Sequence, residues 1–581
     1  MFKKILIANR GEIAIRIART CRDLGVKTVG IYSDSDREAP FLDWMDESYA
    51  LRGRSSSETY TNIQKIIEIA KRSSCDAIHP GYGFLSENAD FALACQEAGI
   101  TFIGPSHEAI FKMGDKLRAR SLAAEAGVPI LPGYGPLEKL SEAESFVTEH
   151  GLPVVIKAAG GGGGKGLRTV NALSELATAI ETAQREGLSY FGSSDVYIEK
   201  YLPHPRHVEV QIFGRCDGDV FAIGTRDCST QRRRQKLIEE APAPLIDDST
   251  RAAMELAAVN LAKAVGYKSA GTVEMLLSPS GDFYFLEMNT RLQVEHTVTE
   301  VVYGCDLVAM QILTAAGYLV DVPSSPLGHA IQCRINAEDV ANDFMPVSGR
   351  IGRLREPAGP WVRVDSGIAS GCELASDYDS LLAKLIVWGK DRREAIDRLR
   401  RALMEYVIEG VPSTLDFHRW MVNRKEFIEG PVSTHFVQDH MDEIRLVGAT
   451  LSAPSIGSHS YNEENLIVEV DGRRFEVIVY SSGENKSQKT NTSSSKVRAA
   501  TSAGLTRRTG EDTLVSPIQG NLLRVLVSEG EMVSAGQPVC IIESMKMENE
   551  IAAHKNGKVS KLLIEPGNPV VVGQPLMEIS S

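Results

Sequence analysis

The sequence predicts a chain of α/β and α+β domains that ends in a small all-β domain. Three observations predict this fold class. Near the N-terminus, apolar runs alternate with amphipathic helical stretches, which is the βαβ pattern of an open parallel sheet. The middle of the chain mixes helical stretches with strand-like runs, and the C-terminal segment repeats a pattern of short strands. A chain of 581 residues is too long for one core, so about three to four domains are expected.

The predicted parallel sheet comes first. Residues 4–9 (KILIAN), 12–25 (EIAIRIARTCRDLG) and 27–33 (KTVGIYS) have the patterns of a strand, a helix and a strand. Residues 75–83 and 100–106 add two more strand-like runs. Strands and helices that alternate in this way indicate parallel strands joined by crossover helices.

Mixed α and β structure is predicted from about residue 115 to 450. Strand-like runs include 153–158 (PVVIKA), 207–214 (HVEVQIFG) and 283–289 (FYFLEMN). Residues 393–407 (REAIDRLRRALMEYV) have a long helical pattern.

The composition changes after about residue 450. Residues 465–480 alternate apolar and polar side chains around Asp471 and Gly472, which predicts a β-hairpin. Residues 481–510 are small and polar and contain six basic side chains against the single acid Glu484, so we expect a flexible linker. About 30 such residues span roughly 30 Å on average and up to roughly 100 Å when extended.

The C-terminal segment contains an internal repeat. GNLLRVLVSEGEMVSAGQPV from Gly520 aligns with GKVSKLLIEPGNPVVVGQPL from Gly557. Two similar all-β halves predict a flattened sandwich with a pseudo-twofold axis. Lys546, in the stretch ESMKMENE, lies between the halves, where the chain must turn back. The sequence therefore predicts a lysine displayed at the tip of a tethered domain.

Composition and charge exclude several classes of protein. The net charge of −13 argues against a nucleic-acid partner. No run of about 18 apolar residues is present, so no membrane partner is expected, and Asn9 and Arg10 interrupt the N-terminal apolar run too early for a signal peptide. Nine cysteines without a C-x-x-C pair predict reduced thiols and a cytoplasmic location.

A glycine-rich loop is predicted to bind phosphate. Five consecutive glycines precede Lys165 in AAGGGGGKGLR, after a strand that ends near Lys157. Glycine lets backbone N–H groups approach phosphates closely. The loop does not match the P-loop pattern, because Gly166 follows the lysine. A flexible surface loop is the alternative.

Two carboxylates and an amide form a candidate metal site. Glu274, Glu287 and Asn289 all lie in strand-like stretches. Oxygen ligands of this kind suit Mg²⁺ or Mn²⁺, which bridge to nucleotide phosphates. The alternative is a pair of exposed strand glutamates.

The C-terminal segment resembles a biotinyl carrier domain, in which a Met-Lys-Met turn holds the modified lysine. Ser544 stands where alanine is common in that family. Lipoyl domains share the fold but usually have Asp-Lys at the turn. The resemblance implies biotin attached covalently to Lys546, against an unmodified or lipoylated lysine.

Residues 1 to 447 resemble biotin carboxylase, an ATP-grasp enzyme. The matching motifs occur in one order: KILIANRGEIAIRI, HPGYGFLSEN, MGDK, IKAAGGGGGKG, EKYLPHPRHVE, QRRRQK, EMNTRLQVEHTVTE, CRINAED and YDSLLAKLI. The two resemblances together imply an N-terminal carboxylase domain (1–114), an ATP-grasp domain (115–330), a C-terminal carboxylase domain (331–447), a short hairpin region (448–480), a linker (481–511) and a biotinyl domain (512–581).

The resemblance also implies roles for individual residues. ATP would be bound by Lys116, Lys157, Gly161, Gly162, Gly163, Gly164, Glu199, Lys200, Leu202 (through its backbone), His207, Gln231 and Arg234. Bicarbonate would be held by Lys236, Arg291, Gln293 and Val294. The metal would be held by Glu274, Glu287 and Asn289. The biotin pocket would be bordered by Tyr82, Gly83 and Arg334, and the catalytic residues would be Glu295 as general base, Arg291, Lys236 and Arg334, which steadies the biotin enolate.

Two positions depart from the common pattern of that family. Arg234 stands where many relatives have histidine, and Gln332 stands where glutamate is common. Neither is the expected base or a metal ligand, so we expect activity to survive.

No segment resembles a carboxyltransferase, so the acceptor site is expected on a partner. The chain plan resembles the α subunit of bacterial acetyl-CoA or propionyl-CoA carboxylases of the actinobacterial type. This implies a biotin protein ligase, a separate carboxyltransferase β subunit and a homo-oligomer formed through the carboxylase domain. Residues 448–480 are interpreted as a docking region for the partner or as a simple extra hairpin.

Three alternatives remain at this level. The chain could serve a 2-oxo acid acceptor, as in a pyruvate-carboxylase-like complex, and no residue here recognises the acceptor. A catalytically inactive biotin carrier or scaffold is disfavoured by the intact set of charged site residues. Another ATP-grasp ligase is disfavoured by the Met-Lys-Met carrier.

Overall fold

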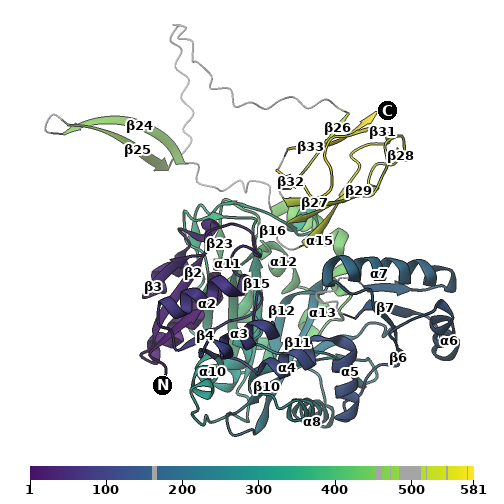
Figure 1. Ribbon diagram of the computed structural model, residues 1–581. Coiled ribbons are helices and arrows are strands. Elements are labelled where there is room, and N and C mark those ends of the chain that lie inside the picture. Colours follow the sequence, from purple (N-terminus) through teal and green to yellow (C-terminus); the bar gives the residue numbers. More distant parts are fainter. Residues whose placement is uncertain are drawn as a thin grey trace. The chain divides into compact units, whose positions relative to one another are not determined.

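The computed structural model in Figure 1 describes residues 1–159, 167–451, 461–470, 473–482, 512–518, 520–544, 547–571 and 573–580. The residues from Met1 to Arg445 form one compact unit, and the C-terminal β-domain belongs to a second. The predicted fold class is confirmed, because an N-terminal parallel sheet, mixed α and β structure and an all-β domain follow one another along the chain.

The N-terminal sheet has five parallel strands in the order β3-β2-β1-β4-β5. Its strands are β1 (Lys4–Ile7), β2 (Lys27–Tyr32), β3 (Glu47–Ala50), β4 (Ala77–His79) and β5 (Thr101–Phe102). Its helices are α1 (Gly11–Asp23), α2 (Ile63–Arg72), α3 (Ala89–Glu97) and α4 (His107–Gly114). The sequence did not predict β3, whose residues ESYA alternate between half-buried and exposed and include no apolar run.

Both faces of this sheet are buried. Ile5 and Ile7 of β1 pack with Ile13 and Ile17 of α1, whereas Leu6 packs with the side chains of α2 and α3. Alternate residues of one strand therefore enter two different cores, as expected when helices cover both faces of a parallel sheet.

A four-stranded antiparallel sheet follows, in the order β6-β9-β7-β8. It is built from β6 (Gly133–Tyr134), β7 (Val154–Ala158), β8 (Leu167–Val170) and β9 (Val196–Lys200), with α5 (Lys116–Glu125) before it and α6 (Leu140–His150) and α7 (Leu176–Phe191) against it. The predicted glycine loop, including Gly161 to Gly164, connects β7 to β8 and lies outside the described residues.

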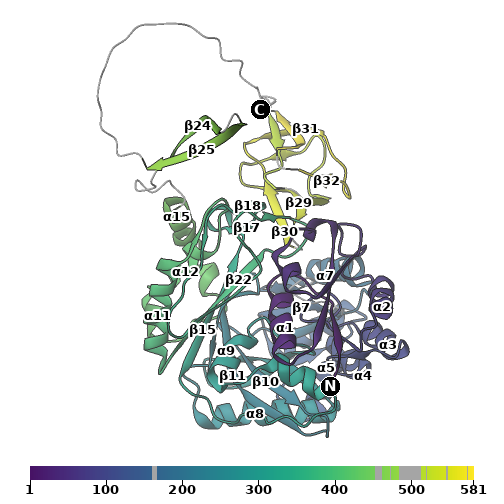
Figure 2. The same cartoon turned by 90° about the vertical axis from the view of Figure 1, so that its left-hand side faces the viewer.

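The central element is an eight-stranded sheet in the order β14-β13-β10-β11-β12-β15-β22-β20. Its strands are β10 (Arg206–Gly214), β11 (Val220–Arg232), β12 (Gln235–Ala241), β13 (Ser269–Leu277), β14 (Phe283–Asn289), β15 (His329–Asn336), β20 (Val362–Ser366) and β22 (Leu381–Gly389). The predicted boundary at residue 330 falls inside this sheet, because β12 pairs with β15 through Ile238 and Cys333. The ATP-grasp and C-terminal segments therefore share one sheet, in which β15 and β22 lie side by side (Figure 2).

Helices pack against the large sheet. They are α8 (Asp248–Ala264), α9 (His296–Tyr303), α10 (Leu307–Ala315) and α11 (Arg392–Glu405). In the described part of the chain no single helix is long and apolar enough to cross a bilayer; by length and composition, only α9 and α10 pass together, as a pair bent by 95°.

Short elements complete the first unit. The small strands are β16 (Glu338–Asp339), β17 (Met345–Pro346), β18 (Gly349–Arg350), β19 (Leu354–Arg355), β21 (Glu373–Leu374) and β23 (Val407–Ile408). The last helices are α12 (Leu415–Met421), α13 (Lys425–Glu429), α14 (Phe436–Asp439) and α15 (Met441–Leu451). Phe344, Phe417 and Phe427 join α11 and β15 in one core.

The predicted hairpin is confirmed. β24 (Tyr461–Val470) pairs antiparallel with β25 (Arg473–Ser482), and Val470 faces Arg473. The predicted turn residues Asp471 and Gly472, and residues 483–511 of the predicted linker, lie outside the described residues.

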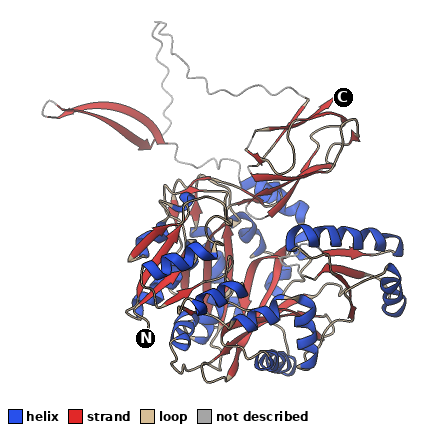
Figure 3. Cartoon of the chain, in the orientation of Figure 1, coloured by secondary structure: helices blue, strands red, loops and turns tan. Residues whose placement is uncertain are grey.

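The C-terminal domain is a sandwich of two four-stranded sheets, with no helix among its described residues (Figure 3). One sheet contains β26 (Thr513–Val515), β28 (Met532–Val533), β31 (Gly557–Leu562) and β33 (Pro575–Ser580). The other contains β27 (Gly520–Val525), β29 (Pro538–Ser544), β30 (Met547–Ala552) and β32 (Pro569–Val570).

Equivalent hydrogen bonds confirm the predicted pseudo-twofold repeat. The N–H of Gly530 bonds to the carbonyl of Val559 at 2.7 Å, and its repeat partner Gly567 bonds to Leu522 at the same distance. The repeated strands also exchange sheets, so that β27 and β31 occupy matching places in the two layers. Lys546 lies in the connection between β29 and β30, outside the described residues.

Glu338 is a buried carboxylate in this fold. It is 3% exposed and accepts hydrogen bonds from Asn336 Nδ2 at 3.0 Å and Ser380 Oγ at 2.7 Å. Burial raises the pKa of Glu338 to about 7, although the two hydrogen bonds act in the opposite direction. The folded chain therefore keeps this proton over a pH range in which the unfolded chain, with a pKa near 4.5, has lost it.

We expect Glu338→Gln to remove a pH-dependent loss of stability. The protonated Glu338 carboxyl contributes fully to the stability of the folded chain below pH 4.5, and this contribution is lost as the pH rises to about 7. The shift corresponds to a cost on the order of 3 kcal/mol above that range. Thermal unfolding should therefore give the variant a higher Tm than the wild type at pH 8, with nearly equal values at pH 5. If the difference in Tm between the variant and the wild type were the same at pH 5 and pH 8, this account would be contradicted.

Candidate active site

A buried lysine organises the candidate site. Lys236, near the start of β12, places its Nζ atom 2.6 Å from Glu209, 2.8 Å from Glu274 and 2.6 Å from Glu295. The sheet brings these groups together, because Glu209 of β10 pairs in register with Glu274 of β13. Glu295 precedes α9. Three carboxylates thus surround the ammonium group of a side chain that is 10% exposed.

The cluster fixes the charge of its members. Burial lowers the pKa of Lys236, but its three carboxylate partners raise it well above the ordinary value. Burial raises the pKa of Glu295, and Lys236, Arg334 and Arg226 more than reverse this, so the pKa ends far below its usual range. Lys236 is therefore a cation and Glu295 a carboxylate at neutral pH.

Arg334 completes the surroundings of Glu295. Its Nη2 atom lies 2.9 Å from Glu295 Oε2, while Lys236 bonds to Oε1 of the same carboxylate. The Nε atom of Arg334 bonds to the fully buried Glu239. Glu295 thus has one cation on each oxygen, and its position is set by β12, β15 and the segment before α9.

The predicted metal carboxylates lie side by side. Glu274 of β13 pairs in register with Glu287 of β14, and Lys116 Nζ lies 3.1 Å from Glu287. Two adjacent carboxylates fit a hard divalent cation. Asn289 directs its Nδ2 atom to Glu274 at 2.8 Å, and its oxygen accepts from Arg291 at 2.9 Å. The carboxylates therefore form a suitable pair, whereas the Asn289 oxygen faces away from Glu274.

The predicted bicarbonate residues form a second hydrogen-bonded group. Arg291 bonds through Nη1 to Gln293 Oε1 at 2.7 Å and through Nε to Glu87 at 2.8 Å. Gln293 Nε2 donates to Glu274 Oε1 at 3.1 Å. The carbonyl of Val294 accepts from Lys384 at 3.2 Å. These contacts connect the segment before α9 to the metal carboxylates.

The predicted nucleotide residues come from several elements. In the sheet β6-β9-β7-β8, Glu199 forms ion pairs with both Lys157 and Arg120. Burial lowers the pKa of Lys157, although the nearby Glu199 carboxylate acts in the opposite direction. Lys200 Nζ bonds to the carbonyl of Gly151 at 3.1 Å. His207 Nε2 lies 3.0 Å from Glu274.

The remaining nucleotide residues lie near the ends of strands. Gln231 on β11 is buried and pairs in register with Lys236 of β12. Leu202 follows β9 and is half-buried. Arg234 lies in the turn between β11 and β12 with a φ of 67°. The structure therefore places Gln231 beside the charged cluster, and it places Leu202 and Arg234 just beyond the strands that carry other nucleotide residues.

Two of the predicted biotin-pocket residues, Tyr82 and Gly83, follow β4, whereas Arg334 lies on β15. The Tyr82 hydroxyl donates to Glu12 on α1. Gly83 has a φ of 68°, a left-handed conformation that favours glycine. Lys236 donates its hydrogen bonds to the three carboxylates. Among the described residues, it makes no hydrogen bond to Tyr82 or Gly83.

Several residues of the site were not predicted from the sequence. Glu209 lies in an expected strand run, but a buried glutamate in a strand pattern carries no distinct motif. Regular alternation would place Glu239, three residues after Lys236 on β12, on the opposite face of the sheet. The pairing of β12 with β11 is irregular between Lys236 and Ile238, which the sequence does not reveal. Glu239 also explains the departure at Gln332. Gln332 pairs in register with Glu239 and donates to it at 2.9 Å, which an ionised glutamate at that position could not do.

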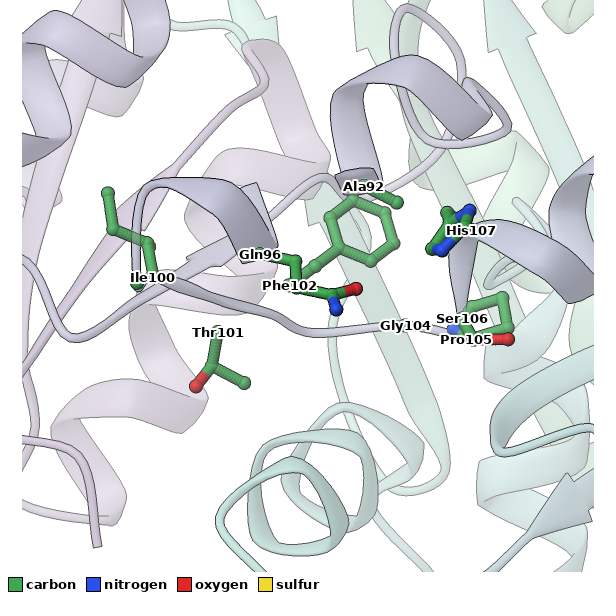
Figure 4. Close-up of a pocket in the computed structure, with 10 residues that line it drawn as sticks. Ala92, Gln96, Ile100, Thr101, Phe102, Gly104, Pro105, Ser106 and His107 are labelled. Atoms are coloured by element: carbon green, nitrogen blue, oxygen red, sulfur yellow. The ribbon is translucent and has the colours of Figure 1, made fainter. Parts of the chain in front are cut away.

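A surface pocket lies elsewhere on the first unit. It has a volume of about 360 Å³ and opens between α3, β5 and α4, with Gln96, Phe102 and His107 among its lining residues (Figure 4). None of the predicted site residues lines it. The candidate site is therefore defined by its charged cluster.

Comparisons with protein families match four segments of the chain. Residues 1–110 match the biotin carboxylase N-terminal domain, 115–322 the ATP-binding domain of the carbamoyl-phosphate synthase L chain, and 332–439 the biotin carboxylase C-terminal domain. Residues 512–579 match the family of biotin-requiring enzymes.

Two relatives match almost the whole chain. The Biotin-dependent acyl-coenzyme A carboxylase alpha3 subunit of Mycobacterium leprae is 42% identical over 99% of this chain and 98% of its own length. The mouse mitochondrial propionyl-CoA carboxylase alpha chain is 37% identical over 100% of this chain and 92% of its own. A pyruvate carboxylase subunit from Methanothermobacter thermautotrophicus is 48% identical, over 76% of this chain and 90% of its own.

Solved structures match the first unit. Biotin carboxylase from Campylobacter jejuni, in a complex with a β,γ-ATP compound, has a TM-score of 0.74 at 45% identity and covers 76% of this chain and 99% of its own. The biotin carboxylase domain of 2-oxoglutarate carboxylase from Hydrogenobacter thermophilus, with MgADP and bicarbonate, has a TM-score of 0.74 at 43% identity and covers 77% of this chain and 99% of its own. With the charged cluster and the biotinyl repeat, these matches show that the chain belongs to the family of biotin-dependent carboxylases, with the domain composition of the acyl-CoA carboxylase α subunits.

Proposed function

We propose that the chain uses ATP and bicarbonate to carboxylate biotin attached to Lys546, as the α subunit of an acyl-CoA carboxylase. One observation carries the chemical part of this proposal: Glu295 is a buried carboxylate kept ionised by Lys236 and Arg334. Bicarbonate is a poor nucleophile until a base removes its proton, and Glu295 is the base best placed to do so.

The reaction begins when Glu295 takes the proton of bicarbonate. A bicarbonate oxygen then forms a bond to the γ-phosphorus of ATP, the bond from that phosphorus to the bridging oxygen breaks, and ADP leaves. The product is carboxyphosphate. Lys236 and Arg291 offset the negative charge that collects as the two anions meet.

Carboxyphosphate then decomposes. Its bond between carbon and the bridging oxygen breaks, which yields CO₂ and leaves the shared oxygen on inorganic phosphate. That phosphate can then take the proton which the biotin nitrogen must lose. Biotin, when attached, would supply this nitrogen as the acceptor of the CO₂ and would carry the carboxyl group to a second site. Arg334 places a permanent positive charge beside this step, and Tyr82 and Gly83 border the entry.

Glu274 and Glu287 would hold Mg²⁺ or Mn²⁺, and the ion would offset the charge of the nucleotide phosphates. Asn289 would support the pair by its hydrogen bond to Glu274. The nucleotide itself would contact Lys116, Lys157, Glu199, Lys200, Leu202, His207, Gln231 and Arg234.

The assignment to an acyl-CoA carboxylase rests on the share of the chain that each relative matches. The acyl-CoA carboxylase α subunits match the chain from end to end, whereas the pyruvate carboxylase subunit matches 76% of it. We therefore propose that a biotin protein ligase modifies Lys546, that the partner is a separate carboxyltransferase β subunit, and that the chain self-associates through the carboxylase unit. We propose a cytoplasmic location, which the nine free cysteines support. The hairpin of β24 and β25 is our candidate docking region for the β subunit.

The proposal predicts that Glu295→Gln removes the base while keeping the shape of the side chain. ADP release that depends on bicarbonate should fall by roughly 10²-fold or more, the range expected for loss of a general base. Binding of ATP, measured by equilibrium dialysis, should change little. A loss below about tenfold in ADP release would mean that another group takes the proton.

A second prediction concerns the carrier lysine. Lys546→Arg should abolish incorporation of biotin when the chain is produced with a biotin protein ligase, as read by an avidin gel shift. ADP release stimulated by free biotin should persist, because the site in the first unit is untouched. Lys558→Arg, an exposed lysine on β31, is the matched control and should be biotinylated normally. Biotinylation of the Lys546 variant would show that another lysine is the carrier.

A further inference from the structure

A buried ion pair joins α1, near the start of the first unit, to β22 of the large sheet. Glu12 lies in the first turn of α1, and Lys384 lies on β22. The Lys384 Nζ atom is 3.1 Å from Glu12 Oε1, and the two side chains are 0% and 2% exposed. Asp365 of β20 is the second anion near Lys384, at 3.8 Å.

Each member of the pair also contacts a proposed pocket residue. Lys384 donates to the carbonyl of Val294, at 3.2 Å, in the proposed bicarbonate pocket. Glu12 accepts from the hydroxyl of Tyr82, in the proposed biotin pocket. The Tyr82 ring itself lies over Lys384, with 5.9 Å between Nζ and the ring centroid. One ion pair therefore connects the two pockets.

One oxygen of the Glu12 carboxylate has no hydrogen-bond partner among the described residues. The Oε2 atom of Glu12 is buried and has no hydrogen-bond partner among the described residues, while its Oε1 atom receives both Tyr82 and Lys384. A pair that served only to hold α1 against β22 would gain stability by satisfying both oxygens. The contacts are instead concentrated on the oxygen that faces the tyrosine.

We propose that Glu12 and Lys384 are positioning residues that hold Tyr82 and the carbonyl of Val294 at a fixed separation. This inference rests on the proposed function, because it assigns these two contacts to biotin and bicarbonate. A buried ion pair is suited to this task, because breaking either partner leaves an uncompensated charge and the geometry therefore has few alternatives. Transfer between two small reactants requires such fixed spacing.

Lys384→Met tests the inference. The methionine keeps the length of the side chain and removes the ammonium group. We expect the KM for free biotin to rise about tenfold or more, as for loss of a hydrogen bond to a charged group, with the KM for ATP changed less than twofold. Equal changes in both constants, or in neither, would overturn the inference.

The matched control is Glu240→Gln. Glu240 is the next residue after the site residue Glu239 on β12, so its side chain projects to the opposite face of the sheet. It is also a buried carboxylate paired with an arginine, at 2.7 Å from Arg392. This variant should leave the KM for biotin unchanged. If it raises that constant as Lys384→Met does, the effect is a general one of losing a buried ion pair.

A second set of variants guards against a folding defect. The double variant Glu12→Gln with Lys384→Met removes both charges of the pair, and Asp365 keeps its ion pair with Arg363 at 2.7 Å. Its KM for biotin should be as high as that of Lys384→Met. Combining Tyr82→Phe with Lys384→Met should add nothing beyond the larger single effect, because both changes act through Glu12. If the increases in the KM for biotin caused by Tyr82→Phe and Lys384→Met multiplied in the combined variant, the inference would be contradicted.

Hydrogen–deuterium exchange separates this inference from the proposed function. Residues 80–84 and 292–296 should exchange faster in Lys384→Met than in the wild type or in Glu240→Gln, whether or not the chain turns over ATP. Faster exchange without any ADP release in the wild type would support the positioning role and refute the proposed reaction. Unchanged exchange and unchanged KM for biotin in an active enzyme would refute the positioning role alone.

Discussion

The contact between Lys236 and its three carboxylates is the constraint on which the rest of the site depends. Without the lysine, Glu209, Glu274 and Glu295 would be three neighbouring buried carboxylates, with Arg226 left beside Glu209 and Arg334 beside Glu295. Removing one partner of a buried ion pair costs on the order of 3–5 kcal/mol, because the remaining charge is uncompensated. The cluster therefore fixes β10, β12 and β13 and the start of α9 relative to one another. It also sets the chemistry, because the same contacts keep Glu295 ionised.

The strand register of the large sheet places these groups next to one another. Glu209 and Glu274 are directly opposed on neighbouring strands, as are Glu274 and Glu287. Arg334 reaches the cluster because β15 pairs with β12, so a residue far along the chain approaches Glu295. One continuous sheet thus carries Lys236, the metal carboxylates and the arginine of the biotin pocket, and the proposed base Glu295 follows this sheet at the start of α9. The unit could not be divided near residue 330 without separating Arg334 from Glu295.

Some of this arrangement could be predicted from the sequence, and the limits have physical causes. The strand character of β13 and β14 was predicted, but a regular pairing that starts from Leu277 and Phe283 would place Leu286 opposite Glu274. An irregularity between Glu274 and Met275 shifts the register, so that Glu287 takes this place. The pseudo-twofold of the C-terminal domain was predictable because the repeat is present in the sequence itself. Glu12 and Lys384 were not, since their contact depends on how two distant elements pack.

The most direct test of this account follows an oxygen atom. The chain would be incubated with Mg-ATP, free biotin and bicarbonate labelled with ¹⁸O, and the inorganic phosphate released would be examined by mass spectrometry. If a bicarbonate oxygen attacks the γ-phosphorus after Glu295 removes the proton, each phosphate formed in a turnover should carry one labelled oxygen. Phosphate without the label would mean that water, and not bicarbonate, attacks the nucleotide, and the role given to the cluster around Lys236 would be wrong.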